Sequence, residues 1–245
     1  MTESGPGAAV RLGRLVVPVE CPGCGADDVR WCDECEAPWW EPPLRCETGA
    51  PRLSALDPPL PVWSIAELDG PVHGVIAAWK DAGRRDLGAL LGAAMRRAAA
   101  EVAPALASVV APGAAPVAVV PCPARAAHTR RRGADLPRAL AEAAAAGLSD
   151  RGFPAAVRAV LVPGRGASRG AGDRGRWRAG APRASRDAWV SREASAALLV
   201  DDVVTTGATL ARAADALAGT PIVPVGALVL ASAQGPSRGP SVGRG

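Results

Sequence analysis

The 245-residue sequence predicts an α/β protein, with a parallel sheet flanked by helices and a small cysteine-rich unit before it. Two observations predict the sheet: short apolar segments recur, and segments of helical period separate them, as is typical of βαβ units. A third observation sets residues 18–60 apart, because they are rich in Cys, Pro and Trp and show no sustained period. We expect 1–17 to be a flexible N-terminus, 61–232 the sheet domain and 233–245 a disordered tail.

Five short segments are the predicted strands. They are rich in Val, Leu, Ile and Ala, as expected of strands buried on both faces of a parallel sheet. Prolines or glycines, which commonly bound strands, lie at or near several of their ends. The strands are predicted at 61–69, 116–123, 155–163, 196–202 and 221–231.

The predicted helices lie between these strands. Residues 70–107 show apolar positions at helical spacing and are expected to form two helices that break near Gly83. Residues 136–148 form the next predicted helix, which Gly147 is expected to stop. A last helix is predicted at 206–219.

Composition and charge exclude few classes of function or partner. The net charge of +4 permits an anionic partner without requiring one, and Lys80 is the one lysine in an arginine-rich chain, which suggests a coding bias. No segment approaches eighteen consecutive apolar residues, and the N-terminus shows no secretion signal. We therefore expect no membrane span and a cytoplasmic location, where six cysteines favour metal binding or chemistry over disulfides.

The spacing of four cysteines predicts a metal site. Cys21 and Cys24 form one C-x-x-C pair, and Cys32 and Cys35 form a second pair seven residues later. Two such pairs can present four thiolates tetrahedrally, as structural zinc requires, so residues 18–60 are expected to be zinc-ribbon-like. A redox pair is the alternative, which is less favoured because neither motif opens a helix after a strand.

The segment "LLVDDVVTTGATL", residues 198–210, predicts a ligand site. A buried strand runs into two adjacent carboxylates, which would lie at the carboxyl end of a parallel strand, where open α/β sheets bind ligands. The loop that follows supplies hydroxyls and backbone amides at the start of a helix, which favour a phosphate. A sugar phosphate would satisfy both parts. The residues concerned are Asp201 and Asp202, then Thr205, Thr206, Gly207, Ala208 and Thr209.

Two other interpretations of this segment stay open. In a nucleotide hydrolase the aspartates would belong to an acidic motif that follows a phosphate-binding lysine loop, but the sequence contains no G-x-x-x-x-G-K-[ST]. The segment could also be an ordinary strand and turn, with a threonine that caps the helix and solvated aspartates.

The same thirteen residues closely resemble the phosphoribosyl pyrophosphate (PRPP) signature of type I phosphoribosyltransferases, and their surroundings resemble the ComF family. The resemblance implies a phosphoribosyltransferase-like sheet preceded by a zinc finger. It also implies that Asp201 and Asp202 hold the ribose hydroxyls while residues 205–209 cradle the 5′-phosphate. Mg²⁺ would accompany PRPP.

Three further segments resemble the family in part. In "VVPCPAR" the backbone amides of Cys122, Ala124 and Arg125, with the Arg125 side chain, would face the pyrophosphate. Lys80 matches the cation of a K-x-x-G turn. "TRRRGADLPRAL" keeps Arg132 and Gly133 of the family's R-x-x-R-G-F-N segment, but Ala134 and Asp135 replace Phe and Asn.

Two segments depart from the family pattern. Residues 163–190 show no period and match poorly, with Arg174 near the family's glutamine; they form either a solvated loop or a surface for nucleic-acid phosphates. Cys46 has lost the partner cysteine of a second family motif and is expected to be a spare thiol.

Three functions remain open; departures from the family pattern at 134–135 and 174–186 favour the second, and the resemblance alone implies the third. A transferase would displace pyrophosphate from ribose C1 with an acceptor that the sequence does not identify. A non-catalytic PRPP or nucleotide sensor would bind PRPP without turnover. A DNA-uptake accessory protein would contact single-stranded DNA or a helicase-like partner.

Overall fold

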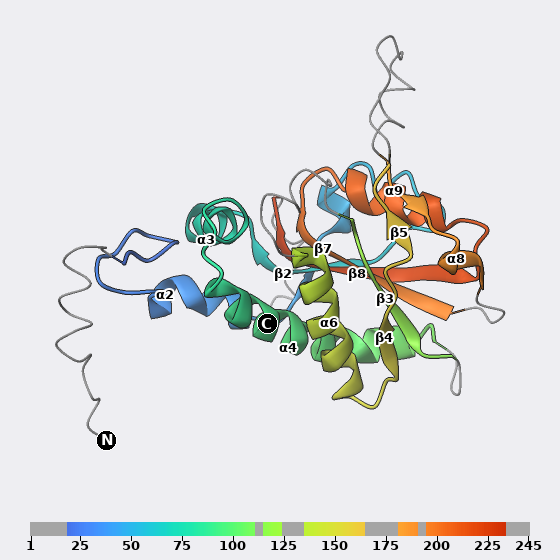
Figure 1. Ribbon diagram of the computed structural model, residues 1–245, viewed down its shortest axis with the longest axis horizontal. Coiled ribbons are helices and arrows are strands. Elements are labelled where there is room, and N and C mark those ends of the chain that lie inside the picture. Colours follow the sequence, from blue (N-terminus) through green and yellow to red (C-terminus); the bar gives the residue numbers. More distant parts are fainter. Residues whose placement is uncertain (1–18, 111–114, 124–134, 165–180, 191–194, 234–245) are drawn as a thin grey trace, which may run out of the picture.

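The computed structural model describes residues 19–110, 115–123, 135–164, 181–190 and 195–233 (Figure 1). The expected flexible N-terminus and all of the expected tail except Ala233 lie outside these ranges. So do several residues that the sequence singled out, namely Ala124, Arg125, Arg132, Gly133, Ala134 and Arg174.

A six-stranded sheet forms the centre of the molecule, with the strand order β1-β2-β8-β7-β3-β4. The pairings of β2, β8, β7, β3 and β4 are all parallel, and the short edge strand β1 is antiparallel to β2. This confirms the predicted mostly parallel sheet. The strands are β1 (Leu44–Arg45), β2 (Val62–Glu67), β3 (Val117–Pro121), β4 (Ala155–Val157), β7 (Ser195–Val204) and β8 (Ile222–Ser232).

The strand expected at 155–163 is divided in two. Its first part is β4, which pairs with β3. Its second part is β5 (Leu161–Val162), which leaves the main sheet and pairs antiparallel with β6 (Arg183–Ala184). A single apolar segment of this length does not reveal that its two halves pair with different partners, because the pairing is set by segments distant in the sequence.

Helices flank the sheet on both faces, and Figure 1 shows α4 and α6 on the opposite side from α9. The break near Gly83 is confirmed, since α3 ends at Lys80, α4 begins at Leu87 and Gly83 has a positive φ of 73°. The helices are α2 (Asp33–Glu36), α3 (Gly70–Lys80), α4 (Leu87–Ala107), α6 (Leu136–Ser149), α8 (Asp187–Val190) and α9 (Ala208–Leu217), with 3₁₀ turns η1 (Ala37–Trp40) and η2 (Glu47–Gly49).

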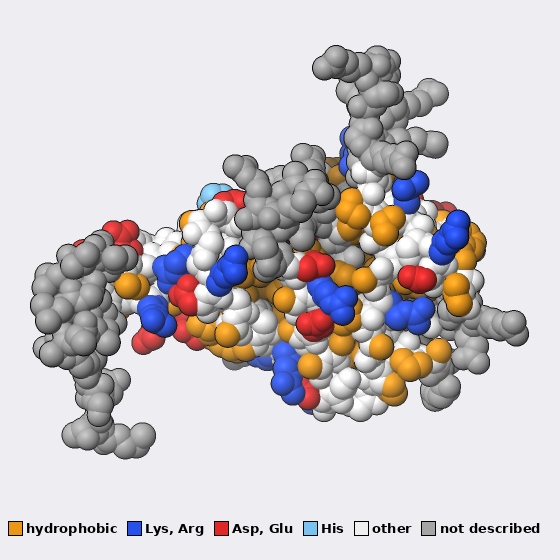
Figure 2. Space-filling view, viewed as in Figure 1, with side chains coloured by type: hydrophobic (Ala, Val, Ile, Leu, Met, Phe, Trp, Pro, Cys, Tyr) orange, Lys and Arg blue, Asp and Glu red, His pale blue; other side chains and the backbone are white. Residues whose placement is uncertain are grey.

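Basic and acidic side chains are interspersed on the face that carries α4 and α6 (Figure 2). Several of them form ion pairs: Arg96 contacts Asp150 at 2.7 Å, and Arg138 contacts Glu142 at 3.0 Å. Among the described residues of this face, the positive charges therefore do not form the continuous strip that a nucleic-acid backbone would favour.

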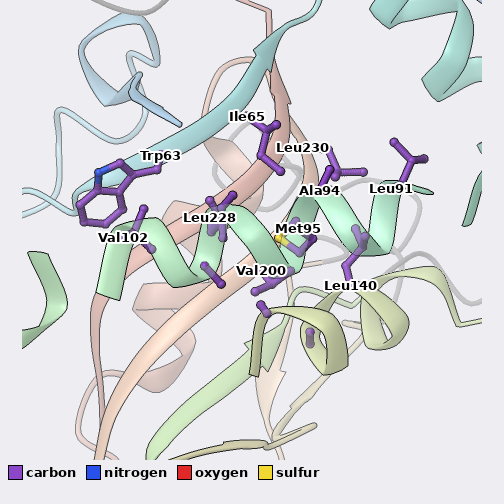
Figure 3. Close-up of a cluster of buried hydrophobic side chains, with 14 of the residues drawn as sticks. Trp63, Ile65, Leu91, Ala94, Met95, Val102, Leu140, Val200, Leu228 and Leu230 are labelled. Atoms are coloured by element: carbon purple, nitrogen blue, oxygen red, sulfur yellow. The ribbon is translucent and has the colours of Figure 1, made fainter. Parts of the chain in front are cut away.

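One hydrophobic core fills the space between the sheet and the helices α3, α4 and α6 (Figure 3). Leu91 and Met95 of α4 are fully buried against this face of the sheet, where Leu228 of β8 is also buried. A second core lies on the other face, under α9. The two cores hold β7 and β8 rigidly from both sides.

The cysteine-rich region contributes side chains to both cores. Trp39 of η1 is buried in the first core, while Ala50 and Leu53, which follow η2, are buried in the second. Burying a leucine side chain such as that of Leu53 stabilises the fold by about 2 kcal/mol. The segment 39–53 is thus anchored to the sheet by these three side chains.

The helix that was expected to stop at Gly147 continues to Ser149, so this prediction is wrong. Gly147 lies where α6 crosses α4, and a Cβ at this position would be 1.9 Å from the carbonyl oxygen of Arg96. The glycine is needed for close packing of two helices. The chain turns instead after Ser149, where Gly152 has a φ of +77°.

We expect Gly147→Ala to lower the free energy of unfolding by about 2 to 3 kcal/mol, because the new methyl overlaps backbone that cannot move freely. Gly92→Ala is the matched control on α4, where the nearest atom to the added Cβ is 4.0 Å away. This control should stabilise the protein by up to about 1 kcal/mol through helix propensity. Urea denaturation measures both, and equal effects of the two substitutions would contradict the packing role of Gly147.

Candidate functional site

The connections that follow the neighbouring strands β3 and β7 lie on opposite faces of the sheet. The chain leaves β3 and returns to β4 through α6 on one face, whereas it leaves β7 and returns to β8 through α9 on the other face. The connections of the neighbouring strands β3 and β7 therefore diverge. Open α/β sheets bind ligands outside the carboxyl ends of strands at such a point.

Asp201 and Asp202 lie in the last part of β7, beside this point of divergence. Asp201 is buried, with 9% of its surface exposed, while Asp202 is half-buried. The backbone N–H of Asp202 donates to Oδ1 of Asp201 at 2.9 Å, which fixes the Asp201 carboxylate. The strand continues to Val204, so both carboxylates stand on rigid sheet backbone.

Burial, followed by the negative charge of Asp202, raises the pKa of Asp201 well above its ordinary value. The backbone hydrogen bond from Asp202 and the charge of Lys80 oppose this rise but do not overcome it. A ligand hydroxyl or a cation at the site would supply the missing stabilisation of the carboxylate. Strongly perturbed carboxyl groups in a crevice are typical of functional sites.

Lys80 reaches the site from the end of α3. Its Nζ lies 2.7 Å from Oδ2 of Asp202, and both side chains are largely buried. A lysine in the last turn of a helix also interacts favourably with the helix dipole. The single lysine that the sequence singled out is thus brought to one of the predicted carboxylates.

The loop after β7 opens a helix. Gly207 has a φ of +75° and is the N-cap of α9, where no side chain caps the helix. The first backbone hydrogen bond of α9 is donated by the N–H of Ala211 to the carbonyl oxygen of Gly207 at 2.9 Å. The preceding amides, those of residues 207–210, have no acceptor within the helix and can receive an anion.

The carboxylate and the loop share one hollow. A small cavity of about 50 Å³ is lined by Asp201 and by residues 203–210. Thr205, Thr206 and Thr209 are exposed around it, and Ala208 is half-buried. Of the predicted acidic pair, Asp201 therefore lies next to the predicted anion loop, whereas Asp202 does not line this cavity and pairs with Lys80.

Residues that the sequence did not single out hold this loop in place. The N–H of Arg52 donates to the carbonyl of Thr206 at 2.9 Å. Leu53 packs so closely on Gly207 that a Cβ there would lie 2.5 Å from Leu53 Cγ. No local pattern around Leu53 indicates this role, because the contact depends on how the N-terminal region meets the sheet.

Cys122 does not offer a group to a ligand, contrary to its predicted contact with pyrophosphate. Its N–H donates to the carbonyl of Val200 at 2.8 Å and so extends the pairing of β3 with β7. Its thiol is buried, and burial, then the charges of Asp201 and Asp202, raise the pKa of Cys122 well above its ordinary value. Ala124 and Arg125, the other predicted contacts of pyrophosphate, lie outside the described residues.

Cys21, Cys24, Cys32 and Cys35 form one cluster, as their spacing predicts. Their four sulfurs all lie within 4.8 Å of one another, and Cys32 Sγ is 3.6 Å from the sulfurs of both Cys21 and Cys24. Four cysteines at these distances could bind a structural metal such as zinc. Cys46 is not part of this group; it is buried in the second core, where burial raises its pKa to about 11.

The charges within the cluster also suit a cation. Although burial acts in the opposite direction, backbone hydrogen bonds lower the pKa of Cys21 to about 6. Burial, hydrogen bonds with the neighbouring thiols and the charge of Cys21 together raise the pKa of Cys35. The four thiols therefore cannot all ionise at neutral pH on their own, and a divalent cation would remove this conflict.

The cluster is attached directly to α3 and to the turn after it. The Arg84 guanidinium donates to the carbonyls of Glu20 at 3.1 Å and Arg30 at 2.9 Å, and it pairs with Asp86 at 2.8 Å. Gly74 of α3 lies against the first C-x-x-C pair, where a Cβ would be 2.3 Å from the carbonyl oxygen of Pro22. The same helix carries Lys80 to Asp202.

A scan against models of known protein families and a search of curated protein sequences returned no match to this chain. Among the described residues, no helix is both long enough and apolar enough to cross a lipid bilayer. Function is therefore inferred from the chemistry of the site, because a fold by itself does not specify one.

The raised pKa of Asp201 predicts how stability depends on pH. Between the pKa of the unfolded chain, about 4, and the higher folded-state pKa, the folded protein binds more protons, so the free energy of unfolding falls as pH rises. Asp201→Asn keeps an oxygen for the Asp202 N–H and removes this charge. We expect the free energy of unfolding of the variant to be higher than that of the wild type by more than about 1.4 kcal/mol at pH 7. This difference should disappear below about pH 4.

Urea denaturation across this pH range measures the effect. Asp215→Asn is the control. Because Asp215 is exposed on α9, this substitution should change the free energy of unfolding little at any pH in the range. A wild type that is more stable than Asp201→Asn at pH 7 would show that Asp201 is fully stabilised as a carboxylate.

Proposed function

We propose that this protein binds PRPP at residues 201–209 and acts as a phosphoribosyltransferase-like protein of the ComF type. One observation carries the proposal: a buried carboxylate and an uncapped helix start line the same hollow at the divergence of β3 and β7. A sugar phosphate has hydroxyls for the first and a phosphate for the second. The resemblance of "LLVDDVVTTGATL" to the PRPP signature supports the same ligand.

Each part of the site would have one role. The carboxylates of Asp201 and Asp202 would accept hydrogen bonds from the ribose hydroxyls, which stabilises a bound sugar by about 1.5 to 3 kcal/mol per charged contact. The amides and hydroxyls of residues 205–209 would bind the 5′-phosphate. Lys80 would hold Asp202 in position through the observed ion pair.

Two metals belong to this proposal. Carboxylate oxygens are ligands that Mg²⁺ accepts, so Asp201 and Asp202 suit an ion that enters with PRPP and neutralises the leaving pyrophosphate. Zn²⁺ would be held by the four clustered cysteines and would have a structural role, because a closed set of four thiolates leaves no coordination position for a substrate.

One departure from the family pattern has a structural explanation. Asp135, which stands where the family has Asn, is the N-cap of α6, and its Oδ1 accepts a hydrogen bond from the N–H of Arg138 at 3.2 Å. Asn and Asp cap helices about equally well. Asp135 therefore keeps the start of α6 capped, as an Asn at this position would.

Calorimetry with PRPP and Mg²⁺ tests the proposal. We expect the wild type and the exposed-carboxylate control Asp215→Ala to bind PRPP, and Asp201→Ala/Asp202→Ala to bind at least about 100-fold more weakly. Absence of binding to the wild type, or equal binding by the double variant, would refute a PRPP site at these aspartates. Release of pyrophosphate with candidate acceptors then distinguishes a transferase from a sensor.

A further inference from the structure

A groove of about 540 Å³ lies at the edge of the main sheet, beside β2. The segment 38–44 forms one wall, the start of α3 forms the other, and residues 64–67 of β2 lie between them. The groove shares no residue with the hollow of the proposed PRPP site. Its occupant can therefore be tested without PRPP.

The groove exists because β1 is shorter than β2. Leu44, the first residue of β1, pairs with Ser64, and in this antiparallel register Pro42 would stand opposite Ala66. A proline has no N–H to donate to a neighbouring strand, so the pairing does not continue there. Pro42 and Ala66 instead face each other across the groove, which both of them line.

The backbone of Ala66 is left open on this side. The carbonyl of Val62 accepts a hydrogen bond from the N–H of Cys46, on the β1 side of β2, at 2.9 Å. Because backbone groups alternate in direction along a strand, those of Ala66 point to the same side. The Ser64 hydroxyl donates to the Ala66 carbonyl at 2.7 Å, but no strand among the described residues pairs with Ala66 there. Such an edge is a template for a further strand.

The side chains around the groove are apolar or acidic. Leu44 exposes 49% of its surface on one wall, and Pro71 is exposed on the other. Glu41, Glu67 and Asp69 are exposed and supply three carboxylates, whereas no Lys or Arg of the described residues lines the groove. An occupant that is extended, apolar and positively charged would complement these walls.

Residues 10–17 of this chain, which we call the N-terminal arm, meet these requirements. They lie outside the described residues and read "VRLGRLVV", with two arginines, no acidic residue and no proline. Their valines favour a strand. The C-terminal residues 234–245 also carry two arginines without an acidic residue, but their prolines and glycines suit a strand poorly.

The chain passes close to the groove soon after the arm. Gly23 packs on Pro71 at the wall of the groove, where a Cβ on Gly23 would lie 3.0 Å from Pro71 Cβ. Val17 precedes Gly23 by six residues, which span at most about 20 Å. The arm can therefore reach the groove without any change in the described fold.

We propose that the N-terminal arm occupies this groove as an additional edge strand of the main sheet. Its backbone pairs with Ala66, and its arginines lie among the three carboxylates. The arm thereby covers a strand edge that could otherwise pair with another molecule. It also ties the segment that precedes the cysteine cluster to the sheet.

Amide hydrogen exchange, followed by NMR on the full chain, tests this proposal. Ile65 supplies an internal reference: the carbonyl of Pro61 accepts from Ala227 of β8 at 2.8 Å, so the backbone of Ile65, four residues on, also faces β8. The N–H of Ile65 should be protected whether or not the arm is docked. The N–H of Ala66 should be protected only by the arm.

Charge reversal in the arm should release it from the groove. We expect the Ala66 amide to exchange at least about 10-fold faster in Arg11→Glu/Arg14→Glu than in the wild type, with Ile65 unchanged. The matched control is Arg238→Glu/Arg244→Glu, which makes the same change of charge in the C-terminal residues. Exchange in this control should equal that of the wild type.

Two further measurements address the groove itself. A synthetic peptide of residues 8–18, added to Arg11→Glu/Arg14→Glu, should restore the protection of Ala66, whereas the peptide with both arginines replaced by Glu should not. Glu41→Lys should accelerate exchange at Ala66 at least about 10-fold. Asp215→Lys, at an exposed carboxylate on α9, should leave this exchange unchanged.

Several results would overturn the proposal. They are an unprotected Ala66 amide in the wild type, equal protection in Arg11→Glu/Arg14→Glu, and failure of the peptide to restore protection. Loss of protection in the C-terminal control alone would assign the groove to residues 234–245. Protection that rises with protein concentration would assign it to a second copy of this chain.

Discussion

Removal of metal from the four-cysteine cluster is expected to lower the midpoint of thermal unfolding by about 10 °C and to release one zinc ion per chain. The reason is that residues 19–36 have little apolar surface of their own, apart from Trp31, which meets Trp39 edge-on at 5.9 Å between ring centroids. Without the metal, no coordination bonds would join the two C-x-x-C pairs, and the pairs would separate.

Two cysteine variants make this prediction specific. Cys24→Ser removes an exposed member of the cluster, so it should abolish zinc binding without creating a cavity. Cys46→Ser changes a buried thiol outside the cluster and should keep one zinc ion per chain. Metal analysis of the purified proteins measures this directly. Retention of zinc by Cys24→Ser, or its absence from the wild type, would refute the site.

Loss of the metal should also weaken PRPP binding, because the first C-x-x-C pair packs on Gly74 and the same helix holds Lys80 against Asp202. Calorimetry on the chelated protein below its unfolding temperature measures this coupling, for which we expect about a 10-fold loss. Unchanged affinity would show that α3 keeps its place without the cluster.

Gly207→Ala is expected to lower the free energy of unfolding by about 2 to 4 kcal/mol and to weaken PRPP binding at least about 10-fold. Two costs combine. A left-handed residue with a Cβ costs about 1 to 2 kcal/mol, and the new methyl would overlap Leu53 Cγ, 2.5 Å away. Relief of this overlap would move the amides that we assign to the phosphate.

Gly219→Ala separates these two costs. Gly219 also has a positive φ, of 82°, but the nearest atom to an added Cβ is Trp189 Cη2 at 3.9 Å. In this control the free energy of unfolding should fall by only about 1 kcal/mol, and PRPP should bind with the affinity of the wild type. In addition, Leu53→Ala should recover part of the loss in Gly207→Ala, and additive effects of the two changes would show that the residues do not act together.

The sequence predicted features that depend on local pattern. Alternating apolar and helical segments predicted the mostly parallel sheet, a glycine between two amphipathic segments predicted the break at Gly83, and cysteine spacing predicted the four-cysteine cluster. In each case the pattern lies within a short segment of sequence, where side-chain periodicity and the positions of glycines depend directly on the local structure.

Features that depend on contacts between distant segments could not be predicted. Gly147 has the local character of a helix stop, but its place is set by a carbonyl on α4. Lys80 could be singled out by composition, yet only the topology brings it to Asp202. The support of the loop by Leu53 and the groove beside Ala66 likewise arise from packing between elements, which no local pattern encodes.

The position of β8 has a consequence for biosynthesis. This strand lies between β2 and β7, so β2 has no parallel neighbour until residues 222–232 emerge from the ribosome. The apolar surface of β2 and the part of α4 that packs on β8 must remain uncovered while most of the chain is being translated. A nascent chain stalled before β8 would therefore be prone to aggregate and would need chaperones until its last strand is inserted.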